Sequence, residues 1–263
     1  MKIALLFVLL GLVCLCTSTP ANPDDNAVII QKRQVDILGN TRKLVEQLIQ
    51  NLQQAAKQAM ESIGSFTQGL QNQAALFGEK LVSDMKDLRD RITEAINKVT
   101  DKFAGAGEAV RACIDSRRQE ADAMFGEAAV KARNCADERM KDVQEMVQNL
   151  RTLSSDAIEF SNGAMEDLKK CTEVNSGNIL ATGACLGSVA LQSEVKGAVF
   201  LTQSGLAISR INLAIATLPA ALDVCAGSQL LSAGISTAKL VMEIGSCSAS
   251  SVFTTFNSNS LLF

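Results

Sequence analysis

The stretch CTEVNSGNILATGAC, residues 171–185, places two cysteines on either side of an Asn-Ser-Gly-Asn tract. Asn, Ser and Gly favour turns, and helical patterns precede and follow this stretch. It therefore predicts a hairpin whose two helical arms meet at residues 175–178. Of the three prolines in the chain, two lie at positions 20 and 23, so only Pro219 is placed to interrupt a helix in the body of the protein. This composition favours an all-α fold.

The N-terminus has the layout of a secretory signal peptide. MKIALLFVLLGLVCLCTST combines the basic Lys2, an apolar run from Ala4 to Cys16 and small residues at positions 16–18. We expect a signal peptide over residues 1–18, followed by a flexible segment over residues 19–36. The apolar run is too short to span a bilayer, and export would bring the chain into an oxidising compartment. Lys32-Arg33 fits either a processing site or ordinary surface charge.

Residues 37–107 predict a long amphipathic helical segment. From Val45 to Phe103, apolar residues recur every three or four positions with a mean spacing close to 3.6, and Gln, Lys, Glu and Asp lie between them. We expect one long helix, or two helices that fold back at residues 64–69 or near Gly78. The two glycines of FAGAG, residues 103–107, predict the end of this segment.

Six of the eight cysteines follow the signal peptide, and helix geometry restricts their pairing. If residues 108–170 form one helix, Cys113 and Cys135 lie about 33 Å apart, far beyond the reach of a disulfide. If the chain instead folds back at residues 175–178 as an antiparallel hairpin, the residue numbers of two facing positions add to a nearly constant value. That sum is 356 for Cys171 with Cys185, and 360 for each of the pairs Cys135–Cys225 and Cys113–Cys247. At about 100° per residue, the spacings also keep the cysteines of each arm on one side of their helix.

We therefore predict an elongated antiparallel helical hairpin over residues 108–250, with a flexible tail over residues 251–263. Three nested disulfides staple the hairpin: Cys171–Cys185, Cys135–Cys225 and Cys113–Cys247.

The return arm of this hairpin is poor in charge. Residues 183–250 contain six charged side chains, at positions 194, 196, 210, 223, 239 and 243. Such helices need cover on most sides, which we expect from residues 38–103 or from a second chain. Because Arg210, Asp223 and Lys239 interrupt the apolar sequence, we expect no run of 18 or more predominantly apolar residues and no transmembrane anchor.

The composition argues against catalysis. The sequence contains no histidine, so imidazole is excluded as acid, base or metal ligand. Paired cysteines cannot act as thiolate nucleophiles or zinc ligands. Acidic pairs such as Asp87 and Asp90 have the spacing of a solvated helix face, and Gly105-Ala106-Gly107 follows no predicted strand, as a nucleotide-binding loop would. We expect no enzyme, and no catalytic, cofactor-binding or metal site. The net charge of −3, with acids and bases interspersed, indicates no nucleic-acid partner.

With this pattern of cysteines the sequence resembles the TsetseEP-domain family of insect secreted proteins, which includes the 27 kDa haemolymph proteins. The resemblance rests on RACIDS, ARNCAD, KKC thirteen residues before ACLG, DVCAG and GSC, set in Ala- and Gln-rich helical sequence over roughly residues 109–248. The chain lacks the Glu-Pro repeat of the namesake protein, so nothing tied to that repeat carries over. The resemblance implies a secreted protein of haemolymph, gut lumen or another secreted fluid, without enzymatic activity.

Two functions follow as expectations. The first is a secreted, non-catalytic helical protein with a structural, interaction or defence role, acting through an unidentified protein partner or through self-association of its apolar helices. The second is an apolipophorin-like carrier of lipid or a hydrophobic ligand, with the amphipathic face of residues 38–103 on a lipid surface. The Gln-rich polar face and the absence of Trp from this segment favour helix packing over lipid binding.

Overall fold

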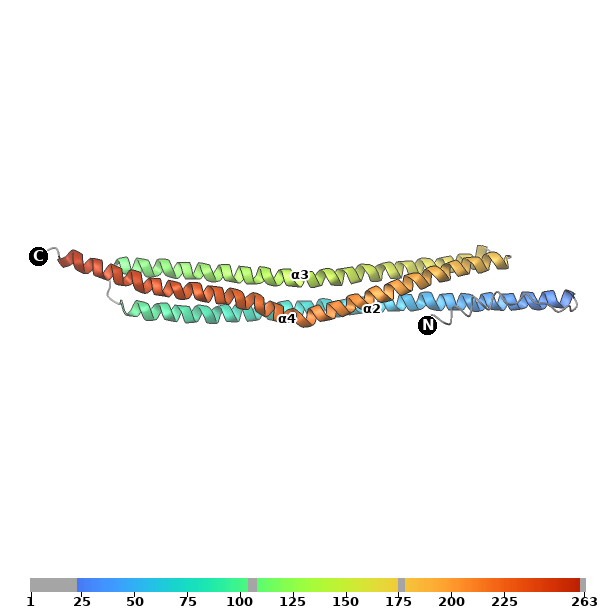
Figure 1. Cartoon of the computed structure of the whole chain (residues 1–263), viewed down its shortest axis with the longest axis horizontal. Helices are drawn as coiled ribbons and strands as arrows, with labels where there is room; N and C mark the ends of the chain where they lie inside the picture. The colour runs from blue at the N-terminus through green and yellow to red at the C-terminus, as the bar shows by residue number, and fades with distance from the viewer. Residues whose placement is uncertain (1–22, 104–107, 175–177, 261–263) are drawn as a thin grey trace. The chain divides into compact units, whose positions relative to one another are not determined.

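A computed structural model describes the backbone of residues 23–103, 108–174 and 178–260, and side chains within these ranges except at positions 23–35, 109, 247, 248 and 250–260. The described residues form three α-helices and no strand: α2 (Pro23–Asp101), α3 (Glu108–Val174) and α4 (Ile179–Ser260) (Figure 1). The prediction of an all-α chain is confirmed.

The helices end where the sequence predicted interruptions. After α2, the Phe103 amide donates to the Thr100 carbonyl over 2.9 Å and closes the last turn. The next helix begins at Glu108, so FAGAG separates two helices, although residues 104–107 lie outside the described residues. A carboxylate in the first turn of α3 also interacts favourably with the helix dipole.

Asn178 caps the start of α4. Its Oδ1 atom accepts a hydrogen bond from the Ala181 amide over 3.0 Å, and its carbonyl accepts one from the Thr182 amide over 2.9 Å. The helices α3 and α4 thus end and begin on either side of the predicted turn, whose residues 175–177 lie outside the described residues.

The helices α2 and α4 extend further toward the chain ends than the sequence predicted. The helix α2 begins at Pro23, so the flexible segment expected over residues 19–36 is wrong from residue 23 onward; proline suits the first position of a helix. The helix α4 continues to Ser260, so the expected flexible tail is wrong for residues 251–260, which contain no Gly or Pro to stop a helix. Of the two alternatives for the amphipathic segment, the single helix is the observed one. The expected signal peptide lies outside the described residues.

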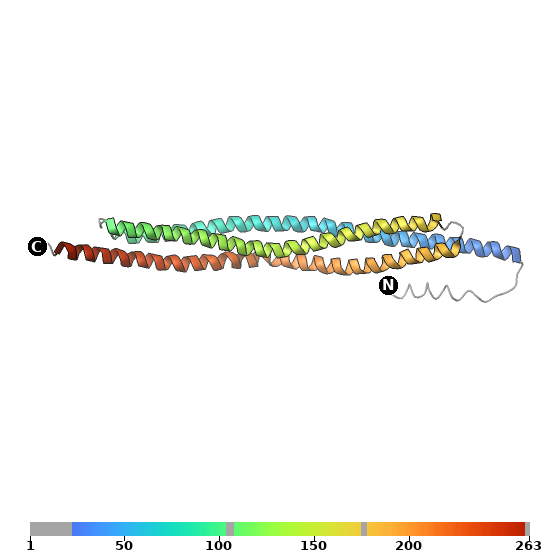
Figure 2. The same cartoon turned by 90° about the horizontal axis from the view of Figure 1, so that it is seen from above.

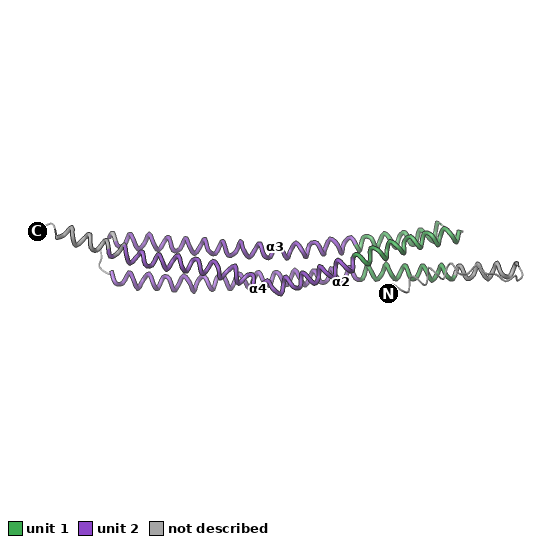
Figure 3. The backbone as a smooth tube through the Cα atoms, viewed as in Figure 1, with its two compact units in different colours: residues 1–54, 157–199 green, residues 55–156, 200–263 purple. Residues whose placement is uncertain are grey.

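The chain divides into two compact units, each containing a segment of all three helices (Figure 3). Unit 1 comprises Met1–Gln54 and Ala157–Val199, and unit 2 comprises Ala55–Asp156 and Phe200–Phe263. The core of unit 1 surrounds the buried Cys171 and contains Val45, Ile49, Ala164, Leu168, Leu186 and Val189.

Unit 2 has two described core clusters, and each draws on all three helices. One contains Ile96, Val110, Ile114, Leu240 and Ile244, and the other contains Ala121, Phe125, Ala128 and Ala233 with the partly buried Met85, Leu88 and Ile92. Every apolar position of the predicted α2 face between Val45 and Phe103 is buried or half-buried. This face therefore packs against α3 and α4 within each unit, as the packing alternative predicted.

Contacts within each unit fix the directions of the helices. The helix α3 runs antiparallel to α4: in unit 2, Arg117 pairs with Glu243, and their residue numbers again sum to 360. By contrast, α2 and α4 run parallel. A methyl group at Gly234 would lie 3.7 Å from Leu88 of α2, and one at Gly245 would lie 4.0 Å from Val99. In unit 1, Gly183 faces Leu38 in the same way.

Two of the three predicted disulfides are present. Cys171 and Cys185 are bonded in unit 1, with Cα atoms 5.5 Å apart, and Cys135 and Cys225 are bonded in unit 2, with Cα atoms 5.7 Å apart. In both Figure 1 and Figure 2, α3 runs beside α4 through unit 2, as the second bond requires. Cys113 is disulfide-bonded, whereas the side chain of Cys247, its predicted partner, lies outside the described residues.

We expect the two disulfides to differ in their contribution to stability. Cys135–Cys225 spans 90 residues and Cys171–Cys185 spans 14. By loop-closure entropy, the longer loop should stabilise by about 4.5 kcal/mol and the shorter by about 3 kcal/mol. In urea unfolding, the free energy of unfolding should therefore fall more for Cys135→Ala/Cys225→Ala than for the matched variant Cys171→Ala/Cys185→Ala. Equal losses would contradict this ranking.

Unit 1 contains a buried hydroxyl without a hydrogen-bond partner, that of Ser193. By comparison, the equally buried Ser161 donates to the Ala157 carbonyl over 2.7 Å. Leaving a buried polar group unpaired costs roughly 1–3 kcal/mol. We therefore expect Ser193→Ala to raise the free energy of unfolding by about 1 kcal/mol relative to the control Ser161→Ala, measured by urea titration. If both substitutions had the same effect, the Ser193 hydroxyl would not be unsatisfied.

Candidate interaction surface

The exposed apolar side chains of this protein are concentrated on α4. Among the described residues, 11 of the 17 exposed large hydrophobic side chains lie on this helix. Single exposed hydrophobic residues are ordinary in soluble proteins, but a group on one element marks an interaction surface. The candidate functional site is therefore a helix face rather than a cavity with reactive groups.

Seven of these side chains lie in unit 2, and six of them, all except Leu201, point in nearly the same direction from α4; we call these six the outer stripe. At about 100° per residue their directions fall within about 40° of one another. Each is between 55% and 69% exposed, so none is covered by α2 or α3. The outer stripe consists of Leu206, Leu213, Val224, Leu231, Ile235 and Met242.

The two flanks of the outer stripe differ in chemistry. On the same helical projection, one flank carries exposed small residues: Ser209, Ala216, Ala220, Gly227 and Ala238. The other flank carries the exposed bases Arg210 and Lys239 together with the exposed Ser228 and Ser232. A helix that packs on the small-residue flank can approach α4 closely, and the bases would then lie at the rim of the contact.

A groove between α2 and α4 continues the outer stripe on its small-residue side. Its volume is about 550 Å³. Leu231 and Ile235 belong to both the groove and the outer stripe, and Leu88 of α2 adds apolar surface. Asp84, Asp87 and Arg91 supply the polar side chains of its lining. Apolar surface with polar residues beside it is the composition expected of a protein contact.

The sequence offered a signal for this surface, namely the scarcity of charge on residues 183–250. The expected cover is present on only part of α4, because α2 and α3 pack on its inner faces and leave the outer stripe exposed. The position of the outer stripe on α4 could not be predicted from the sequence. That position depends on the rotation of α4, which its contacts with two other helices determine.

The expectation that the apolar C-terminal part of the chain contains no run of 18 or more predominantly apolar residues is wrong. Within Ile179–Ser246 one stretch of 18 residues has a mean hydropathy of 1.5 with at most two charged residues, and only 17% of it is buried. By length and composition this helix is therefore able to cross a membrane. The expectation failed because Arg210, Asp223 and Lys239 are 13 and 16 residues apart, so that a window of this length contains at most two of them.

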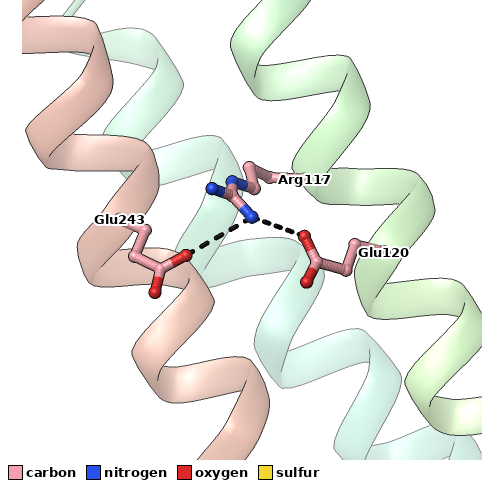
Figure 4. A network of polar contacts seen from close by, with 3 residues as sticks. All are labelled: Arg117, Glu120 and Glu243. Atoms are coloured by element: carbon pink, nitrogen blue, oxygen red, sulfur yellow. Dashed lines mark hydrogen bonds and ion pairs between the residues drawn. The ribbon is translucent and has the colours of Figure 1, made fainter.

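Ion pairs link the helices of unit 2 at its surface. Lys80 of α2 contacts Asp223 of α4 at 3.1 Å and Asp84 of its own helix at 3.3 Å. Arg117 of α3 lies between Glu120 on the same helix, at 2.6 Å, and Glu243 on α4, at 3.4 Å (Figure 4). The hydrogen bond to Glu120 is the main cause of the raised pKa of Arg117. Exposed pairs of this kind orient helices more than they stabilise them.

Of the positions considered for chemistry, the structure describes the acidic pair Asp87 and Asp90 on α2. Asp87 and Asp90 are both exposed, as expected for a solvated helix face. Gly105-Ala106-Gly107 lies outside the described residues. In the part of the chain that the structure describes, no three side chains of His, Cys, Asp or Glu lie close enough together to hold a metal ion.

Comparison with protein-family models, curated proteins and solved structures gave no match for this chain. The disulfides themselves indicate an oxidising compartment.

The pKa of Lys80 provides a test of the contact between α2 and α4. Its hydrogen bond to Asp223 is the main cause that raises this pKa above the usual 10.5, and its hydrogen bond to Asp84 is the next. The ion pair therefore contributes fully to the stability of the folded protein below pH 10.5. This contribution is lost as the pH rises through the raised pKa of Lys80. We expect Asp223→Asn to lower the pKa of Lys80, measured by NMR titration of its side chain. The control Glu79→Gln should leave that pKa in place; an unchanged value in Asp223→Asn would show that the contact does not form in solution.

Proposed function

We propose that this chain is a secreted, non-catalytic helical protein that acts by binding other protein surfaces through α4. A structural role or a role in defence would both use such binding. The proposal includes membership of the TsetseEP-domain family, which rests on the cysteine pattern quoted above.

The outer stripe of α4 is the observation that carries the proposal. It presents six large apolar side chains to solvent on a helix that a disulfide joins to α3. A chain without a further role for this surface would gain solubility by replacing these residues with charged ones. An exposed apolar face on a stapled scaffold suits recognition, because little conformational freedom is lost when a partner binds.

The disulfides and the N-terminal pattern support the assignment to a secreted fluid. Disulfides persist in oxidising compartments and are rare in the cytosol. The sequence before Pro20 has the composition of a signal peptide, which would deliver the chain to such a compartment.

A carrier of lipid or a hydrophobic ligand is the second candidate, and the apolar character of α4 favours it. The face of α2 that was expected to lie on lipid is instead packed against α3 and α4. A lipid contact would therefore involve the outer stripe.

Photo-crosslinking in the full chain separates these roles. A photoreactive residue replaces Leu213 on the outer stripe, and in a control protein it replaces Val130, which is 58% exposed on α3. In the medium into which cells secrete the protein, we expect protein adducts at position 213 and few at position 130. Lipid adducts alone would favour the carrier. Equal labelling at both positions, or no adduct at position 213, would overturn the proposal.

A further inference from the structure

We infer that the outer stripe is the interface of a homodimer in which the α4 helices of two copies pack in parallel around a twofold axis. This inference rests on the proposed role of α4 as a protein-binding surface, and it names a second copy of the chain as the partner.

The order of residues along the outer stripe suits pairing with an identical helix. Leu206 to Leu213 and Val224 to Leu231 are each steps of seven residues, the spacing at which two packed helices meet repeatedly. Exposed small residues such as Ala220 and Gly227 lie beside the large ones. Large side chains next to small ones allow two copies of α4 to interdigitate.

The area of the outer stripe is sufficient for a dimer. From Leu206 to Met242 the helix rises about 54 Å, and a contact about 10 Å wide over this length covers roughly 540 Å² on each copy. The total of about 1,100 Å² passes the roughly 1,000 Å² expected of a specific interface. Surface of the groove beside Leu231 and Ile235 would add to this total.

Charge decides the direction of packing. The outer stripe centres near Val224, so an antiparallel pair would place Arg210 of one copy beside Lys239 of the other. Like charges at that distance repel. A parallel pair instead places the basic flank of each copy over the small-residue flank and groove of the other.

In the parallel arrangement Lys239 of one copy faces the groove of the other. Gly234 and Gly245 lie opposite Leu88 and Val99 of α2, so Lys239 lies level with residues near 93 of that helix. Among the charged side chains of the groove, Arg91 is nearest to this level, and Asp87 lies about 9 Å further toward the N-terminus of α2, the direction in which helical side chains lean. Two acids, Asp84 and Asp87, and one base, Arg91, give the groove a net charge of −1, which favours the basic flank of the other copy.

A lipid surface fits this face less well. The bases lie on one flank only, and the outer stripe contains no aromatic residue. Helices that lie on membranes commonly have bases across the polar face and aromatic residues at the boundary.

Sedimentation of the full chain over a range of concentrations tests the dimer. The wild type should dimerise, and Leu213→Glu should raise the dissociation constant at least about tenfold, because it removes a central apolar contact. Val130→Glu, which adds the same charge at an exposed position of α3, should leave the constant unchanged. Circular dichroism checks that both variants keep their helices. A monomeric wild type, or equal effects of the two substitutions, would overturn the inference.

Charge reversal tests the direction. Lys239→Glu and Asp87→Lys should each weaken the dimer roughly threefold to tenfold, and the double variant should recover most of this loss. In an antiparallel dimer, Lys239→Glu or Arg210→Glu alone would strengthen association, which would exclude the parallel arrangement.

A last measurement separates failure of the dimer from failure of the proposed function. Flotation with vesicles of neutral and of anionic phospholipid should leave the wild type unbound. Binding to vesicles by a monomeric chain would overturn both the dimer and the protein-binding role. A monomer that crosslinks through position 213 to a different protein would overturn the dimer alone.

Discussion

The disulfide between Cys135 and Cys225 fixes the register of α3 against α4 in unit 2. Once these residues face each other, each residue of α3 lies opposite a defined residue of α4. The pair Arg117–Glu243 follows the same register. The register brings apolar residues of both helices to the side where α2 packs. The core clusters around Ile114 and Phe125 therefore depend on this alignment, since a shift of one residue would rotate the apolar face by about 100°.

Each unit must bury the apolar surface of three helices, and α4 has more of it than two neighbours cover. The helices α2 and α3 carry Gln, Lys, Arg, Asp and Glu on the sides that face solvent. On α4 the corresponding side carries the outer stripe. A helix packed against only two others always retains a solvent-facing side, so the composition of that side determines whether the protein can remain alone in solution. On α4 that composition is apolar, which is the basis for assigning it a partner.

The chemistry of the described residues agrees with a role in binding. The ionisable groups of the inter-helix ion pairs are exposed, and the groove beside α4 is lined mainly by aliphatic carbon with three charged side chains. Such a surface recognises shape and apolar area, with charges that set orientation. The buried hydroxyls of Ser154, Ser161 and Thr237 donate to carbonyls of their own helices, so they belong to helix packing rather than to a site.

An all-α chain, helix interruptions at residues 103–107 and 175–178, and the pairing of four cysteines could all be predicted from the sequence. These features depend on periodicity, on turn-forming residues and on the rise and rotation of an ideal helix, all of which are local properties. Which side of α4 remains exposed depends on its packing against α2 and α3, because the inner and outer sides of that helix are both apolar. Local periodicity cannot distinguish two apolar sides. The packing of Leu88 and Val99 beside glycines of α4, together with the Cys135–Cys225 bond, sets the rotation that leaves Leu213 and Val224 in solvent.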